Sequence, residues 1–142
     1  MLFKSFYSFF IMKTIYTANL IIQKKGKFLL VKRASGDEVN LWSLPGGTKE
    51  NDEKIEDTLK REIKEELGLN IKESTLFKSY NNIFKDKIVI SHYFTINNID
   101  QNIVLNKEEL SDCKFFSFKD IPRDLAYKQN IVLNEFIDSQ KD

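Results

Sequence analysis

The sequence predicts an α/β fold in which a mixed β-sheet is flanked by helices. A length of 142 residues and a mass of 16.7 kDa suit a single domain with one substantial core. The 42% hydrophobic and 30% charged residues are the balance of a globular protein. Strand and helix patterns follow the order β-β-β-α-β-β-β-α, and this separation of the helices by several strands argues against a regular doubly wound sheet.

The first part of the chain predicts a hairpin and a third short strand. Residues 18–23 and 28–31 are rich in β-forming side chains, and Gly26 lies in the turn between them. A polar loop follows over residues 34–40. Residues 42–47 then read as a strand that runs into a Pro-Gly-Gly turn.

A helix is predicted over residues 53–67. Gly68 follows it and suits the end of a helix, and we expect Asn51 or Asp52 to cap its start. Apolar residues recur at every fourth position and predict the buried stripe of this helix: Ile55, Leu59, Ile63 and Leu67.

The second half of the chain predicts three more strands and a closing helix. The strands are expected at residues 76–80, 87–96 and 115–118, with residues 81–82 and 85–86 as turn material between the first two. The apolar face of the last helix is formed by Ile131, Val132, Leu133, Phe136 and Ile137.

Charge and rare residue types exclude several function classes. The 22 basic and 21 acidic residues leave a net charge of +1, so we expect neither a nucleic-acid polymer nor a membrane as partner. The single cysteine, Cys113, excludes a disulfide framework within the chain, and the single histidine, His92, excludes a multi-histidine metal site. We expect a cytoplasmic protein that is a monomer or a homodimer.

The N-terminus is a short aromatic segment. It has no small-residue cleavage site, and it is shorter than the ~20 apolar residues that a transmembrane helix needs. Met12-Lys13 begins a segment that reads like an ordinary protein start, so residues 1–11 are expected to be dispensable. We therefore divide the chain into an N-terminal extension, residues 1–12, and a single domain, residues 13–142.

Three carboxylates lie close together on the predicted helix. At about 100° per residue, Glu62 and Glu66 differ by about 40° around the helix axis and lie one turn apart. Both are within about 20° of Ile55, beside the apolar stripe, where two carboxylates repel unless a cation lies between them. Glu65 lies on the flank. Such oxygen ligands suit Mg²⁺ or Mn²⁺, although a solvated charged face is the alternative.

The glycine turn before this helix favours the metal-site interpretation. Two glycines let the backbone approach a ligand closely, and their carbonyl groups can face a cation. Gly47, Glu53 and the run Arg61-Glu62-Ile63-x-Glu65-Glu66-x-Gly68-Leu69 form one spaced pattern. This pattern matches the Nudix box in every defined position, and over about residues 14–125 the chain resembles the Nudix family.

This resemblance implies an α/β/α sandwich with a mixed sheet. It also implies Mg²⁺-dependent hydrolysis of a nucleoside diphosphate linked to another group X, with Mn²⁺ as a possible substitute. Divalent ions would neutralise the oxygens of the pyrophosphate. The resemblance assigns their coordination to one carbonyl group and three carboxylates: Gly46, Glu62, Glu65 and Glu66.

The resemblance also implies roles around the metal ligands. Glu53 would pair with Arg61 and fix the loop against the helix. A glutamate would take the proton of the attacking water, and Glu65 or Glu109 is expected to be this base. The substrate would be contacted by Arg33 and Gly47.

The substrate is expected to be a small nucleotide. The sequence lacks the signatures of three subfamilies, which act on ADP-ribose, dinucleoside polyphosphates and coenzyme A. Their absence favours a nucleoside triphosphate as substrate, including deoxynucleoside and oxidised triphosphates. The alternatives are another NDP-X, such as a nucleotide sugar or dinucleotide, and a noncatalytic nucleotide-binding module. Several aromatic residues are expected to be core rather than base-stacking: Phe28, Trp42, Tyr80, Phe84 and Tyr93.

Overall fold

The computed structural model describes residues 12–141, so the expected dispensable segment, residues 1–11, lies outside the described part. The strands are β1 (Lys13–Ile21), β2 (Gln23–Lys24), β3 (Lys27–Arg33), β4 (Trp42–Ser43), β5 (Gly46–Thr48), β6 (Thr75–Phe84), β7 (Lys87–Thr95) and β8 (Leu110–Ser117). The helices are α2 (Ile55–Leu67) and α3 (Asn130–Ser139), with two short 3-10 helices, η1 (Phe118–Asp120) and η2 (Ala126–Lys128).

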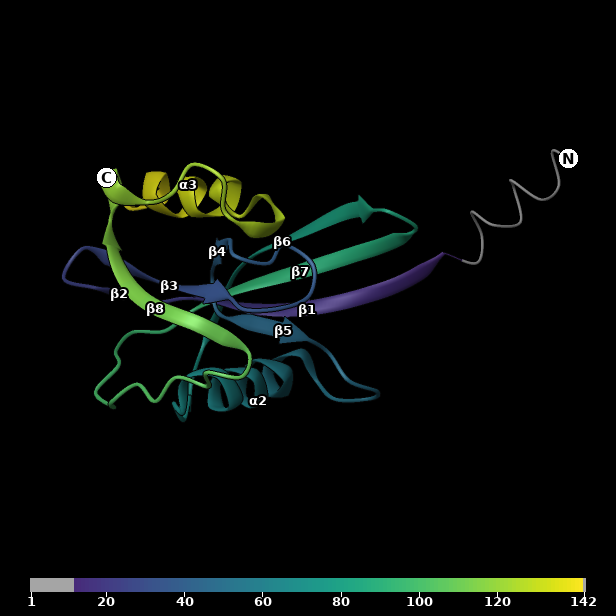
Figure 1. The fold of residues 1–142 in the computed structure, drawn as a ribbon, viewed down its shortest axis with the longest axis horizontal. Helices are drawn as coiled ribbons and strands as arrows, with labels where there is room; N and C mark the ends of the chain where they lie inside the picture. Colours follow the sequence, from purple (N-terminus) through teal and green to yellow (C-terminus); the bar gives the residue numbers. More distant parts are fainter. Residues whose placement is uncertain (1–11, 142) are drawn as a thin grey trace, which may run out of the picture.

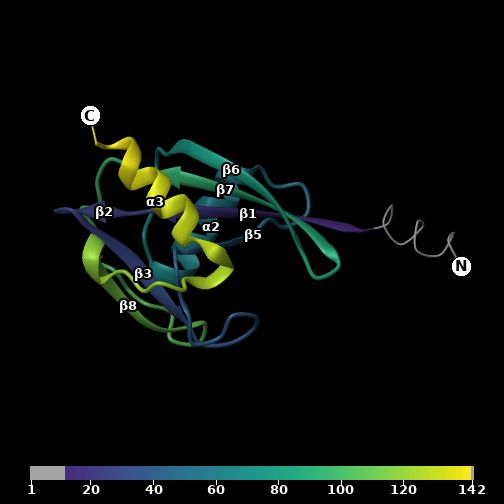
Figure 2. The same ribbon diagram turned by 90° about the horizontal axis from the view of Figure 1, so that it is seen from above.

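Two four-stranded sheets form the centre of the molecule. The first has the order β5-β1-β7-β6 and is mixed, because β1 runs parallel to β7 while its pairing with β5 is antiparallel. The second is antiparallel and joins β2, β3 and β4, with β8 on the other edge of β3. Helix α3 lies above the strands and α2 below them in Figure 1, and Figure 2 shows α3 crossing the upper face. The predicted α/β/α sandwich with a mixed sheet is thus confirmed.

Strand alternation divides the core into two clusters. Successive side chains of a strand point to opposite faces, so β1 and β3 each serve both helices. On the α2 side, Leu20 and Leu29 pack with Leu59 and Ile63. On the other side, the buried residues belong to a cluster with α3: Ile21, Phe28, Leu30, Leu125, Val132 and Leu133. The two clusters fix α2 and η2–α3 on opposite faces of the same strands.

Three local predictions were wrong. Gly46 and Gly47 do not form a turn: the chain bends at Pro45, and the two glycines are the first residues of β5, opposite Asn19 and Ala18 of β1.

Residues 81–82 are not a turn, because β6 continues to Phe84 and pairs with β7 without interruption from Lys78 onward. The turn falls at residues 85–86. The residue at the N-cap of α2 is Lys54, which makes no side-chain capping bond. Neither Asn51 nor Asp52 caps the helix, because the chain turns once more before it begins. Within residues 12–141, no helix is long and apolar enough to cross a membrane.

Candidate active site

Helix α2 carries three carboxylates at different depths. Glu66 is only 6% exposed. The side chain of Glu62 is 14% exposed, whereas that of Glu65 is 46% exposed. This gradient follows from the helical spacing, which puts Glu62 and Glu66 next to the buried stripe and Glu65 on its flank.

Glu66 joins helix α2 to the first residue of β5. The backbone N–H of Gly46 donates a hydrogen bond of 3.0 Å to Oε1 of Glu66. The pKa of Glu66 is raised to about 8, mainly because the carboxyl group is buried. The hydrogen bond from Gly46 and the charge of Arg33 oppose this rise, and the charges of Glu62 and Glu109 add to it. A carboxylate with these neighbours is stabilised by an added positive charge.

Arg61 connects the other acids of the site. Its Nη2 lies 2.8 Å from Oε1 of Glu53, and its Nε donates to Oε2 of the same carboxylate at 3.2 Å. Its Nη1 lies 2.9 Å from Glu62 and 3.4 Å from Glu65. Nη2 also donates to the carbonyl of Thr48 at 2.9 Å, which ties α2 to the end of β5.

The two glycines at the start of β5 are required for different reasons. A Cβ on Gly46 would overlap the carbonyl oxygen of Ala18 and lie 2.7 Å from Cα of Asn19, so the close approach of two backbones excludes a side chain there. A Cβ on Gly47 would instead overlap the carboxyl group of Glu62 and lie 2.5 Å from both of its oxygens. Gly47 thus leaves room for a carboxylate, not for backbone.

Glu109 and Arg33 reach the same cluster from other elements. Glu109 is exposed just before β8, and its charge raises the pKa of both Glu62 and Glu66. Its backbone carbonyl accepts a hydrogen bond of 3.1 Å from the N–H of Ala34, which directly follows β3. This pairing of β3 with the start of β8 brings Arg33 and Glu109 to the acids of α2.

A pocket of about 70 Å³ lies between the β6–β7 hairpin and the start of α3. It is lined by Tyr80, Asn82, Tyr93, Tyr127, Lys128, Ile131 and Val132. Of the aromatic residues expected in the core, Phe28 and Tyr93 are buried, and Trp42 packs edge-on against Phe116 with ring centroids 4.9 Å apart. Two of the aromatic residues expected in the core, Tyr80 and Tyr93, line this pocket. Tyr93 is also buried in the core cluster on the α3 side.

The acid cluster fits a divalent cation by its chemistry rather than by preformed geometry. Within residues 12–141, no three His, Cys, Asp or Glu side chains are gathered into a ready metal site. However, burial and its acidic neighbours raise the pKa of Glu62, as they do that of Glu66. Such desolvated, mutually repelling oxygen donors suit a hard cation, which would replace Arg61 as the partner of Glu62 and Glu65.

Three residues of the site region were not predicted from the sequence. Gln129 is 3% exposed, and its Oε1 accepts a hydrogen bond of 2.7 Å from the N–H of Leu44, shortly before β5. The side chain of Asn19 lies against Gly46. Tyr127 lies under Arg33. Of these, only Asn19 gave a signal, as a polar residue in an apolar strand.

Comparison with known proteins agrees with this geometry. The family model of the NUDIX domain matches residues 12–138. An ADP-ribose pyrophosphatase of Methanocaldococcus jannaschii is 31% identical over 119 residues, covering 82% of this chain and 69% of that protein. Nucleoside triphosphatase NudI of Escherichia fergusonii is 33% identical over 126 residues, covering 79% of this chain and 86% of that protein.

The fold has solved counterparts. The crystal structure of a MutT protein from Methanosarcina mazei Go1 superposes with a TM-score of 0.82 at 23% identity, covering 93% of this chain and 99% of that chain. The chain therefore belongs to the NUDIX family. It is a Nudix hydrolase, and members of this family generally use divalent metal ions.

Proposed function

We propose that this Nudix hydrolase is a Mg²⁺-dependent pyrophosphohydrolase that cleaves a nucleoside or deoxynucleoside triphosphate, an oxidised one included, to the monophosphate and pyrophosphate. The observation that carries the proposal is the pair of desolvated carboxylates, Glu62 and Glu66, held against Gly46 and Gly47. These groups gain most from a bound divalent cation, and a polyphosphate is the ligand that such a cation recruits.

Each residue around the two glycines has a proposed role. Glu62, Glu65, Glu66 and the Gly46 carbonyl would hold the ions, with Mn²⁺ as a substitute for Mg²⁺. Bound ions would neutralise phosphate oxygens and lower the pKa of water. Arg61 would keep α2 and β5 in register through Glu53 and the Thr48 carbonyl, to which it already donates hydrogen bonds.

The general base is proposed to be Glu109 rather than Glu65. The carboxylate of Glu65 lies 3.4 Å from Nη1 of Arg61 and would exchange this partner for the metal ions, so its oxygens are assigned to binding cations. Within residues 12–141, Glu109 makes hydrogen bonds through its backbone, and none joins its side chain to another residue. An exposed carboxylate that faces the acid cluster is better placed to take the proton as water attacks phosphorus.

The substrate class is supported from two directions. The pocket beside α3 has tyrosine rings and an amide, which suit stacking and hydrogen bonding of a nucleobase. The relative from E. fergusonii is named a nucleoside triphosphatase, which supports a triphosphate. The relative from M. jannaschii is named an ADP-ribose pyrophosphatase, so a nucleoside diphosphate linked to another group is the second candidate.

A nucleotide panel tests the proposal. The protein is incubated with Mg²⁺ and each nucleoside triphosphate, ADP-ribose, nucleotide sugars and dinucleotides, and phosphate release is followed with and without added inorganic pyrophosphatase. Pyrophosphate formed from triphosphates supports the proposal. Monophosphates formed only from the other substrates support the second candidate, and no hydrolysis across the panel contradicts both.

A further inference from the structure

Tyr127 has a backbone conformation that is rare for a tyrosine. Its φ and ψ are 55° and 28°, and the φ of the next residue, Lys128, is 56°. Two consecutive residues with side chains in the left-handed region are strained, and such strain persists where surrounding contacts over-determine it. The contacts of the Tyr127 ring show what this turn achieves.

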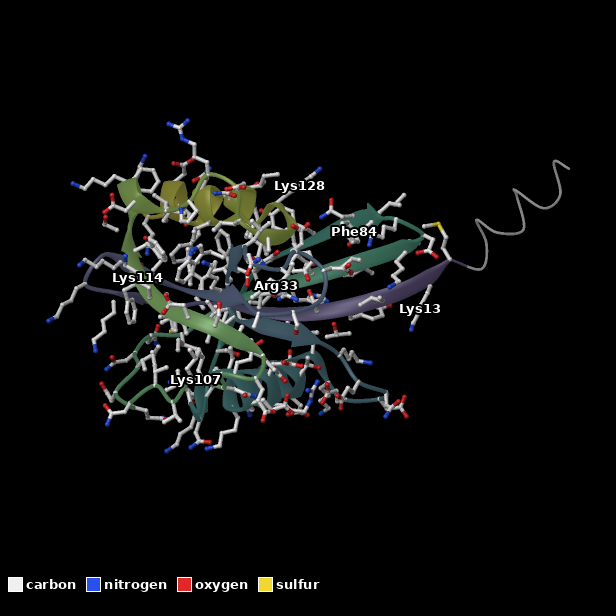
Figure 3. All side chains as sticks on the ribbon, in the orientation of Figure 1. Lys13, Arg33, Phe84, Lys107, Lys114 and Lys128 are labelled. Atoms are coloured by element: carbon white, nitrogen blue, oxygen red, sulfur yellow. The ribbon has the colours of Figure 1, made fainter. Side chains whose placement is uncertain are left out.

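The turn places the Tyr127 ring under a guanidinium group. Cζ of Arg33 lies 5.1 Å from the ring centroid, within the range of a cation–π contact. The ring of Phe84, at the tip of the β6–β7 hairpin, meets Tyr127 edge-on with centroids 6.5 Å apart. In Figure 3, Arg33 lies near the centre of the view, with Phe84 above and to the right of it and Lys128, the neighbour of Tyr127, above both.

A single carbonyl holds both partners. Nε of Arg33 donates a hydrogen bond of 3.1 Å to the carbonyl oxygen of Asp37, and the hydroxyl of Tyr127 lies 3.5 Å from the same oxygen. The carboxylate of Asp37 is engaged elsewhere, 3.3 Å from Nζ of Lys85. The face of the Arg33 guanidinium group is therefore held by the Tyr127 ring, and its Nε by the carbonyl of Asp37. Neither of these two groups carries a negative charge.

The charge of Arg33 remains available to an anion. Across residues 12–141, no Asp or Glu forms an ion pair with Arg33, whereas Arg61 pairs with Glu53, Glu62 and Glu65. Backbone hydrogen bonds place the end of β3, where Arg33 lies, beside the acid cluster. The N–H of Ala34 donates to the carbonyl of Glu109 at 3.1 Å, and the N–H of Asn106, in the same segment as Glu109, donates to the carbonyl of Glu66 at 2.9 Å. An orientated, unpaired guanidinium beside a cation site matches the geometry of a phosphate clamp.

We propose that Tyr127 is a positioning residue that orientates Arg33 toward the phosphates of the substrate. The inference rests on the proposed function and adds a residue to it. A free arginine side chain loses much rotational freedom when it binds an anion, and a ring that already holds the guanidinium removes part of this loss. Tyr127 thus acts through Arg33 and needs no contact with phosphate itself.

The test is a double-mutant cycle on the full chain. Tyr127→Asn removes the ring but suits the left-handed backbone, and Tyr127→Phe keeps the ring face. These variants, Arg33→Ala and the combined Tyr127→Asn/Arg33→Ala protein are compared with the wild type. Phe118→Leu, which alters an exposed ring on η1, is the matched control. Thermal unfolding and near-UV circular dichroism establish that each variant is folded.

The readout is the affinity for inorganic pyrophosphate in Mg²⁺, measured by calorimetry. We expect Tyr127→Asn to weaken binding about 5- to 20-fold, Tyr127→Phe to stay within about threefold, and Tyr127→Asn to have no further effect once Arg33 is alanine. Unchanged binding in Tyr127→Asn, multiplicative effects in the cycle, or no pyrophosphate binding by the wild type would overturn the inference.

Steady-state kinetics separate this inference from the proposed function. On the substrate that the panel identifies, Tyr127→Asn should raise KM more than it lowers kcat, and the rise should be smaller when Arg33 is alanine. Tyr127 also lines the pocket proposed for the nucleobase, so the part of the effect that depends on Arg33 is the part that reports positioning of a phosphate contact. A wild type that binds pyrophosphate through Arg33 and Tyr127 but hydrolyses no nucleotide refutes the proposed function and leaves the role of Tyr127 standing.

Discussion

The backbone N–H of Gly46 donates a hydrogen bond of 3.0 Å to Oε1 of Glu66, a carboxylate that is 6% exposed. This bond joins the first residue of β5 to the last turn of α2 and orientates a buried acid toward the two glycines of β5. The geometry of the site therefore depends on how closely the backbone of Gly46 and Gly47 approaches the carboxyl groups of Glu66 and Glu62.

Gly47→Ala is expected to inactivate the enzyme without unfolding it. The new Cβ would overlap the carboxyl group of Glu62, which is the movable end of a side chain, so Glu62 is displaced while the backbone stays. Misplacement of a ligand by about 1 Å costs on the order of 100-fold in rate. Steady-state kinetics and thermal unfolding check this.

Gly46→Ala is the matched comparison. Its Cβ would meet the backbone of Ala18 and Asn19, at a φ of +152°, so this variant should lose stability as well as activity. Equal stability of the two alanine variants, or full activity of Gly47→Ala, would contradict the account of these two glycines.

Glu109→Gln is expected to lower kcat by about 100-fold or more with little change in KM, because the amide cannot take the proton from water. Glu65→Gln, which removes the carboxylate bound to Arg61, should lower kcat less. The comparison uses saturating Mg²⁺ and substrate. A larger loss of kcat in Glu65→Gln than in Glu109→Gln would indicate that Glu65, and not Glu109, is the general base.

Acid stability should depend on Glu53. Hydrogen bonds from Arg61 lower the pKa of Glu53 from 4.5 to about 2. A depressed carboxylate pKa stabilises the fold above the unfolded value and loses this contribution as the pH falls, here from 4.5 toward about 2. The stability difference between wild type and Glu53→Gln should therefore be full near neutral pH and shrink across this window.

Urea denaturation at a series of pH values measures that difference. Glu50→Gln is the control, because Glu50 is 67% exposed and lies 3.6 Å from Arg61. It should show a smaller effect with little pH dependence. A Glu53→Gln penalty that is constant from neutral to acid pH would refute the ion-pair explanation.

Gln129→Met is expected to destabilise the protein by about 1–3 kcal/mol, because the buried N–H of Leu44 loses its acceptor. Gln140→Met is the control, since the side chain of Gln140 is exposed and its Nε2 donates to the side chain of Gln23. Chemical denaturation gives both values. Equal free energies of unfolding for Gln129→Met and Gln140→Met would contradict this prediction and show that the N–H of Leu44 finds another acceptor.

Helical spacing and the position of the glycines account for what the sequence predicted. The four-residue repeat of apolar side chains in α2 was enough to place Glu62 and Glu66 at its buried edge. The two glycines likewise marked where the backbone comes close to the helix, although they lie in β5 and not in a turn. The strand order around the helices predicted the mixed sheet, because it left no room for a regular doubly wound arrangement.

Contacts between distant segments account for what the sequence did not predict. The cation–π contact of Arg33 with Tyr127 joins β3 to η2, and nothing near either residue signals it. Asn81 and Asn82 have the composition of a turn, but pairing with β7 outweighs this local preference. At the start of α2, Glu53 accepts hydrogen bonds from the backbone N–H of Glu50 and the hydroxyl of Thr58. Neither donor is a backbone N–H of the helix, so α2 begins without a side-chain cap.

The central claim is that Glu66 holds a catalytic divalent ion. The most direct measurement is kcat of Glu66→Gln on the substrate found by the panel, at saturating Mg²⁺, with thermal unfolding as the check on the fold. The account predicts a loss on the order of 100- to 1,000-fold in a folded protein, because the amide keeps an acceptor for Gly46 but carries no charge to bind the ion. Near-wild-type kcat in this variant would contradict the account.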